Sequence, residues 1–220
     1  MWLLPRTVTT VLFDWDGTLC DSGAAHLATF QKTLAEFGIA ITREQFQAVY
    51  TPAWYHMYEA FGLPRAEWPQ ADRRWMFHYG NLTSELVMGA GSVVARLRAA
   101  GLHLGVVTGG NRERVARELA RHGLTAAFPA VVCHEDVTRT KPHPEGIRKA
   151  LEILEDSARH CCYVGDTPDD VLMGRAAGVF TVAVATEYVH RSRLEACGAD
   201  VLIDRIEHLP TAIALPGSGT

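Results

Sequence analysis

The chain has 220 residues, 48% of them hydrophobic, so it can form one large domain, or one domain with an insert, around a substantial core. Its formal net charge of −4 leaves no basic footprint for nucleic acid, and its apolar runs are far too short to span a membrane. The apolar start, residues 1–4, is ended by Pro5 and Arg6 and therefore lacks the pattern of a signal peptide.

The first predicted element is a strand over residues 7–13, which ends abruptly in the sequence Asp-Trp-Asp-Gly-Thr at residues 14–18. Alternate side chains of a strand share a face, so a strand that extended to residue 16 would point Asp14 and Asp16 the same way. Gly17 can then turn the chain sharply because it has no Cβ. A divalent cation would offset the repulsion between the two carboxylates. This stretch predicts a metal-bound acid pair, with an exposed turn as the alternative.

The next expected element is a helix from Ser22 to about Phe37, followed by an aromatic segment. Residues 43–86 carry no convincing strand, and ten of the nineteen aromatic residues lie between Phe46 and Tyr79. Thr51 is predicted to cap a further helix, with Pro52 at its first position.

Within that helix, the helical spacing of Trp54, Met57 and Phe61 predicts a packed apolar face. Tyr55, His56 and Glu59 lie off this face and are candidates for substrate contact, with a solvated surface as the alternative.

From Gly89 onward, short apolar strands alternate with helices. The strands are predicted at residues 102–108, 131–133, 161–165, 181–184 and 201–203. Helices are expected at residues 92–100 and after Asn111, Pro144 and Pro168. Strands without polar alternation, separated by helices, imply an α/β fold with a parallel sheet covered on both faces.

Polar residues follow four of these strands. In open parallel sheets, ligand sites lie beyond the carboxyl ends of the strands, so these residues should converge at one edge. They are Asp14 and Asp16, then Thr108-Gly109-Gly110, then Lys141, and finally Asp166 to Asp170.

This set suits phosphoryl transfer, in which catalysis is mostly positioning and charge stabilisation. Asp14 would attack phosphorus, and Asp16 would protonate the leaving oxygen and later deprotonate the attacking water. Thr108 and the following backbone amides would hold phosphate oxygens. Lys141 would offset negative charge, and Asp166 would complete the acidic ligands of the metal.

The same segments, residues 14–18, Thr108-Gly109, Lys141-Pro142 and residues 165–170, resemble the four motifs of the haloacid dehalogenase (HAD) superfamily in the family's order. The resemblance covers about residues 8–209. It implies a Rossmann-like core, a Mg²⁺ cofactor and a nucleophilic first aspartate.

Motif matching assigns a role to each acid. Asp14 would be nucleophile and metal ligand, and Asp16 would be acid and base with its main-chain carbonyl on the metal. Asp166 would also bind the metal. Thr108, Gly109 and Lys141 would bind phosphate, and Asp170 would be a supporting residue that orients Lys141 or metal-bound water.

The resemblance also implies an inserted α-helical cap. We expect the α/β core at residues 1–20 and 87–215, the cap at residues 21–86, and a loose tail at residues 216–220. A cap above the strand ends would exclude water and select the substrate.

The presence of one residue and the absence of another disfavour two activities of the superfamily. Dehalogenases of the superfamily lack the second acid, which is present here as Asp16, and phosphonatases need a cap lysine. The only lysine between the first two motifs is Lys32, in the predicted first helix. The overall similarity is to phosphoglycolate phosphatase-like members, acting on a small phosphorylated metabolite, and sugar phosphomutases remain the alternative. A non-catalytic phosphate-binding regulator is disfavoured by Asp16 and by the cap. Oligomeric state is not predicted.

Two further features receive structural interpretations. On a strand, Trp15 would face away from the acid pair and pack in the core. The five cysteines are odd in number and lack metal-finger spacing, which predicts buried free thiols and a reducing, cytoplasmic location.

Overall fold

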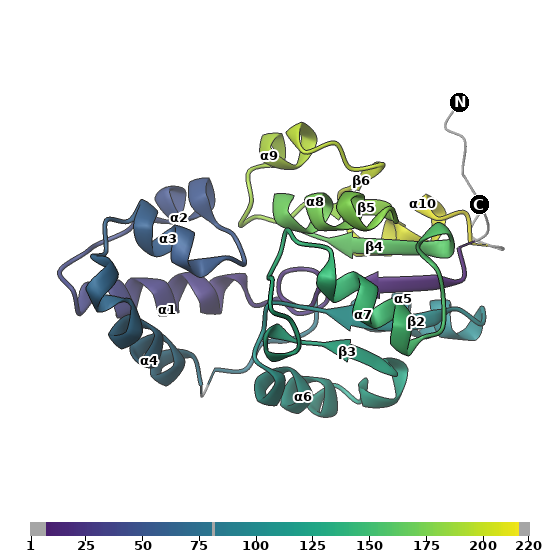
Figure 1. The fold of residues 1–220 in the computed structure, drawn as a ribbon, viewed down its shortest axis with the longest axis horizontal. Helices are drawn as coiled ribbons and strands as arrows, with labels where there is room; N and C mark the ends of the chain where they lie inside the picture. Colours follow the sequence, from purple (N-terminus) through teal and green to yellow (C-terminus); the bar gives the residue numbers. More distant parts are fainter. Residues whose placement is uncertain (1–7, 81, 216–220) are drawn as a thin grey trace.

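The computed structural model describes residues 8–80 and 82–215. Six strands form a parallel sheet in the order β3-β2-β1-β4-β5-β6 (Figure 1), which is the order of a Rossmann-type fold. The predicted α/β class is confirmed. The strands are β1 (Thr10–Phe13), β2 (His103–Val107), β3 (Ala130–Val132), β4 (Cys161–Gly165), β5 (Phe180–Val184) and β6 (Val201–Ile203).

Helices cover both faces of this sheet (Figure 1). They are α5 (Ala90–Ala99), α6 (Arg112–Arg121), α7 (Glu145–Ile153), α8 (Pro168–Ala177), α9 (Arg191–Ala196) and α10 (Leu209–Ala212). Val11 and Phe13 of β1 belong to the same buried cluster as residues of α5 and α6. Leu12, which points to the opposite face, belongs to the cluster that contains residues of α7 and α8.

Of the five α-helices described between β1 and β2, all but α5 lie beyond the carboxyl ends of the strands (Figure 1). They are α1 (Gly23–Ala35), α2 (Arg43–Val49), α3 (Trp54–Ala60) and α4 (Trp68–Tyr79). We refer to α1–α4 as the helical cap. Its buried residues, among them Phe30, Phe46 and Met57, form one cluster with Val171 and Tyr188 of the core, so the cap is packed against the sheet domain.

The first strand ends at Phe13, as predicted, so the alternation that would point Asp14 and Asp16 the same way does not reach residue 16. One local prediction is wrong. Helix α3 begins at Trp54 instead of Pro52. The hydroxyl of Thr51 donates to Asp169 and accepts from the amide of Ala53, so Thr51 contacts the core before the helix starts.

Other local predictions are confirmed. Asn111 caps α6 by accepting from the amides of Glu113 and Arg114. Pro168 is the first residue of α8. Cys20, Cys133, Cys161 and Cys162 are buried free thiols, and Cys197 is free and half-buried.

Two predictions fall partly or wholly outside the described residues: the loose tail at residues 216–220, and the start of the first strand at residue 7. In the described part of the chain, no helix has the length and apolar character needed to cross a lipid bilayer.

Candidate active site

The acidic residues meet at the point where the strand order reverses. Strand β1 pairs with β2 on one side and with β4 on the other, and the chain crosses from one half of the sheet to the other between β3 and β4. Ligands of open α/β sheets bind at such a reversal, beyond the carboxyl ends of the strands. Asp14 directly follows β1, and Asp166 directly follows β4.

Lys141 lies buried between two of these acids. Its Nζ donates to Asp14 at 2.6 Å and to Asp170 at 2.7 Å. Burial lowers the pKa of Lys141, but the two carboxylates raise it more, so its pKa lies above the usual value and the ammonium stays charged.

Hydrogen bonds fix the position of the Asp170 side chain in the first turn of α8. Besides Lys141, its oxygens accept from the hydroxyl of Tyr163 at 3.0 Å and from the amide and hydroxyl of Thr167 at 3.0 and 2.6 Å. Because all these donors are buried, Asp170 fixes the position of the Lys141 ammonium beside Asp14.

The cluster is short of positive charge. Carboxylate oxygens of Asp14, Asp166 and Asp170 lie within 4.8 Å of one another, and all three residues are buried. Burial raises the pKa of Asp14 to about 7 and the pKa of Asp166 well above its usual value, with their acidic neighbours adding to both shifts. One lysine cannot balance three buried carboxylates, and hard oxygen ligands of this kind suit a divalent cation such as Mg²⁺. Asp14 and Asp166 are the better candidates, since the oxygens of Asp170 are already occupied.

Gly17 allows the turn to approach this cluster. Its φ of +83° lies in the left-handed region, and a Cβ at this position would be 2.3 Å from Oδ2 of Asp166. Thr18 then donates to Oδ1 of Asp166 at 3.2 Å. The turn after β1 therefore needs glycine both for its backbone conformation and for its contact with Asp166.

Asp16 lines the same cavity as Asp14 but contacts different residues. Its two oxygens accept from Arg114 at 2.9 and 2.5 Å, and Nε2 of His26 lies 3.7 Å from it. Although burial raises the pKa of Asp16, Arg114 and His26 lower it below its usual range. Asp16 is therefore an anion in this arrangement, and proton transfer by Asp16 requires its ion pair with Arg114 to open.

Arg114 was not predicted from the sequence. It is buried in α6 and also pairs with Glu118 at 3.0 Å, while Glu118 accepts from the indole of Trp15 at 2.6 Å. Trp15 is fully buried, as predicted. The available signal was the i,i+4 spacing of Arg114 and Glu118, which directly precede the apolar positions Val115 and Leu119.

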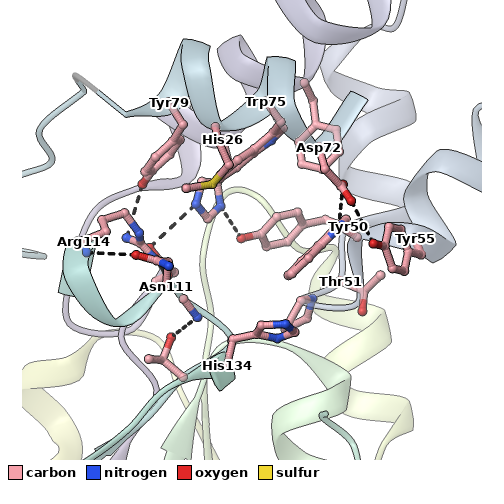
Figure 2. A pocket seen from close by; sticks show the side chains of 18 of the residues that line it. His26, Tyr50, Thr51, Tyr55, Asp72, Trp75, Tyr79, Asn111, Arg114 and His134 are labelled. Atoms are coloured by element: carbon pink, nitrogen blue, oxygen red, sulfur yellow. Dashed lines mark hydrogen bonds and ion pairs between the residues drawn. The ribbon is translucent and has the colours of Figure 1, made fainter. Parts of the chain in front are cut away.

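A cavity of about 440 Å³ lies between the cap and the strand ends. Its sheet side includes Asp14, Thr108 and Gly109. Figure 2 shows rings of the cap, among them Tyr50 and Trp75, opposite residues of the core. Two aspartates, a threonine and a glycine turn thus line one cavity, as nucleophilic attack on a phosphate ester would need.

Of the residues of α3 predicted to contact substrate, only one lines the cavity. Tyr55 lines the cavity, whereas His56 and Glu59 are exposed and are not among its lining residues. Met57 is buried in the cap, as its spacing predicts. Trp54 packs on the same cluster but also lines the cavity, so its role is not confined to packing.

Several lining residues were missed altogether. They come from α1, α4 and the loop after β3, and the sequence offered no periodic signal for them. They are His26, Asp72, Trp75, Tyr79 and His134.

The chain is similar to known proteins over most of its length. The model of the family described as haloacid dehalogenase-like hydrolase matches residues 11–184. Pyrophosphatase PpaX of Bacillus mycoides strain KBAB4 is 32% identical over 206 residues, which cover 92% of this chain and 95% of that protein.

Two solved structures share the fold. A predicted phosphoglycolate phosphatase from Haemophilus somnus 129PT has a TM-score of 0.82 at 19% identity, covering 94% of this chain and 98% of that one. A beta-phosphoglucomutase from Clostridium difficile has a TM-score of 0.75 at 17% identity, covering 92% and 93%.

Proposed function

Because this chain is a phosphatase of the haloacid dehalogenase-like hydrolase family, we propose that it is a Mg²⁺-dependent phosphomonoester hydrolase that forms an aspartyl-phosphate. Its substrate is a small phosphorylated metabolite, as in phosphoglycolate phosphatase-like proteins. The observation that carries the proposal is the buried contact of Lys141 with Asp14 and Asp170, beside Asp166, at the reversal of the strand order.

In this mechanism a carboxylate oxygen of Asp14 attacks phosphorus, and the bond from phosphorus to the alcohol oxygen breaks. Asp16, once released from Arg114, takes up a proton from solvent and gives it to the departing alcohol. The resulting carboxylate then takes a proton from the water that hydrolyses the aspartyl-phosphate. The products are the alcohol and inorganic phosphate. Both acids line the cavity that would hold the ester.

The remaining residues stabilise charge. The hydroxyl of Thr108 and the amide of Gly109 bind phosphoryl oxygens, while the amide of Gly110 donates to the Thr108 hydroxyl at 3.0 Å and orients it. Lys141 offsets the negative charge that develops there, and Asp170 positions Lys141. Mg²⁺, when bound by Asp14, the main-chain carbonyl of Asp16 and Asp166, supplies further positive charge to the phosphoryl group.

Two alternatives use the same residues. A sugar phosphomutase would transfer the phosphoryl group back to the sugar, and a structural neighbour bears that name. A pyrophosphatase, the activity named for the relative from Bacillus mycoides, would release two phosphates from one substrate.

A screen of phosphate esters, sugar phosphates and pyrophosphate, with and without Mg²⁺, distinguishes the proposed hydrolase from the mutase and the pyrophosphatase. The proposal predicts free phosphate and free alcohol from an ester, and no release by Asp14→Asn. Conversion of a sugar phosphate to its isomer would favour the mutase. No turnover of any compound by the wild type would favour a non-catalytic regulator.

We also propose the division into a core of residues 1–20 and 87–215 and a cap of residues 21–86, which is supported by the positions of α1–α4. A cytoplasmic location is supported by the five unpaired cysteines.

A further inference from the structure

The cavity is much larger than the phosphoryl site. Its volume of about 440 Å³ falls within the range that encloses drug-sized ligands, so most of it is available to the alcohol part of the substrate. Aromatic rings of the cap form much of its wall: Phe30, Tyr50, Trp54, Tyr58, Trp75 and Tyr79. The ring of Trp54 also approaches the ring of His134 from the core, with a centroid distance of 5.2 Å. Such a wall favours a substrate whose alcohol part is flat and apolar.

The charged side chains of the wall disfavour a substrate whose alcohol part is anionic. Away from the phosphoryl site, Asp72 and Glu135 line the cavity. Of its lining residues, all in the described part of the chain, Arg114 is the only lysine or arginine, and it is paired with Asp16 and Glu118. A carboxylate or second phosphate on the alcohol part would therefore lose its hydration without gaining an unpaired cation.

We propose that the substrate is the phosphate monoester of an alcohol that bears an aromatic or heteroaromatic ring and no negative charge, with the ring held in the cap cavity. This inference rests on the proposed phosphatase function and names the substrate class of the same site. It separates the chain from enzymes whose leaving group is a small anion, such as glycolate or phosphate.

The direct test compares substrates by phosphate release in the presence of Mg²⁺. The ring-bearing esters are 2-phenylethyl phosphate and adenosine 5′-monophosphate, and the anionic competitors are 2-phosphoglycolate and pyrophosphate. We expect kcat/KM for at least one ring-bearing ester to be about tenfold or more higher than kcat/KM for either competitor. An equal or higher value for either competitor would overturn the inference.

Two variants with matched controls locate the preference. Trp54→Ala should lower kcat/KM for the ring-bearing ester but not for acetyl phosphate, which lacks a ring. Phe77→Ala removes an exposed ring of α4 outside the cavity and should change neither. Equal losses on both substrates in Trp54→Ala would indicate a merely structural role and contradict the inference.

Asp72→Lys adds a cation to the wall and should shift the substrate ratio toward 2-phosphoglycolate about tenfold. Glu59→Lys, with the same change of charge on the exposed face of α3, should leave the ratio unchanged. An unchanged ratio in Asp72→Lys would count against the inference.

Failure of the inference and failure of the proposed function give different results. Hydrolysis of acetyl phosphate that depends on Asp14, without a preference for ring-bearing esters, would leave the phosphatase and remove the inference. If the wild type hydrolyses nothing, calorimetric titration of Asp14→Asn still decides the inference. It predicts tighter binding of 2-phenylethyl phosphate than of 2-phosphoglycolate, and the reverse order would overturn it.

Discussion

Replacing Arg114 with methionine would remove the buried ion pair that joins α6 to the turn after β1. Arg114 is 8% exposed and donates to both oxygens of Asp16 and to Glu118, which is also buried. Its removal leaves two buried carboxylates without their counter-charge. Breaking a buried ion pair in this way costs about 3–5 kcal/mol, so we expect the free energy of unfolding to fall by that amount.

Urea unfolding at neutral pH in the presence of EDTA measures this loss, followed by tryptophan fluorescence and circular dichroism. Arg112→Met is the matched control, because Arg112 lies on the same helix but is 54% exposed in its pair with Asp136. It should lose less than about 1 kcal/mol. In the double variant Arg114→Met with Asp16→Asn, part of the loss should be recovered, since one orphaned charge is gone. Equal losses for Arg114→Met and Arg112→Met would refute the reasoning.

Three further predictions concern charge and metal. Lys141→Met should lower kcat/KM about 10²-fold or more, because no ammonium then faces Asp14. Lys32→Met, at an exposed position of α1, should retain wild-type kinetics, and similar rates for the two variants would count against the site. EDTA should abolish phosphate release and added Mg²⁺ should restore it, so undiminished release in EDTA would contradict the metal assignment. Burial raises the pKa of Asp156, but hydrogen bonds from Thr10, the Ser157 amide and Thr9 outweigh it and hold the pKa below its usual 3.8. The stability from Asp156 is therefore present above pH 3.8 and is lost as pH falls through the lower folded-state value. Asp156→Asn should destabilise the protein at neutral pH and weaken its acid sensitivity below about pH 4, as followed by urea unfolding at several pH values; an unchanged pH dependence would argue against this role.

The residues at the strand ends could be located from the sequence because parallel strands end at one edge. Asp14, Thr108 and Asp166 follow β1, β2 and β4, and pairing of these strands brings their ends together whatever the cap does. The cap of the α/β fold was predictable for a similar reason, since the long interval between Asp14 and Thr108 carries helical rather than strand periodicity.

The contacts of the second acid could not be predicted in this way. Asp16 lies beyond the end of β1, and its partner Arg114 is 98 residues further along the chain. Neither helical nor strand periodicity reports a contact between a turn and a distant helix. The start of α3 was misplaced because the hydroxyl of Thr51 is bound to Asp169 of the core, which local propensity does not register.

The residues that line the cavity could not be predicted from periodicity either. The apolar spacing of α3 correctly indicated that Trp54 packs in the cap, but the fold also places that ring against His134. Whether an aromatic residue of the cap lines the cavity depends on how the cap closes over the strand ends, and this is a property of the tertiary structure.

The central claim is that Asp14 becomes phosphorylated during turnover. The most direct test is to quench the enzyme with acid while it turns over an ester with Mg²⁺, and to locate the phosphoryl group by peptide mass spectrometry. We predict one phosphoryl group on Asp14, and none in Asp14→Asn. A phosphoryl group on another residue, or continued turnover by Asp14→Asn, would contradict the mechanism.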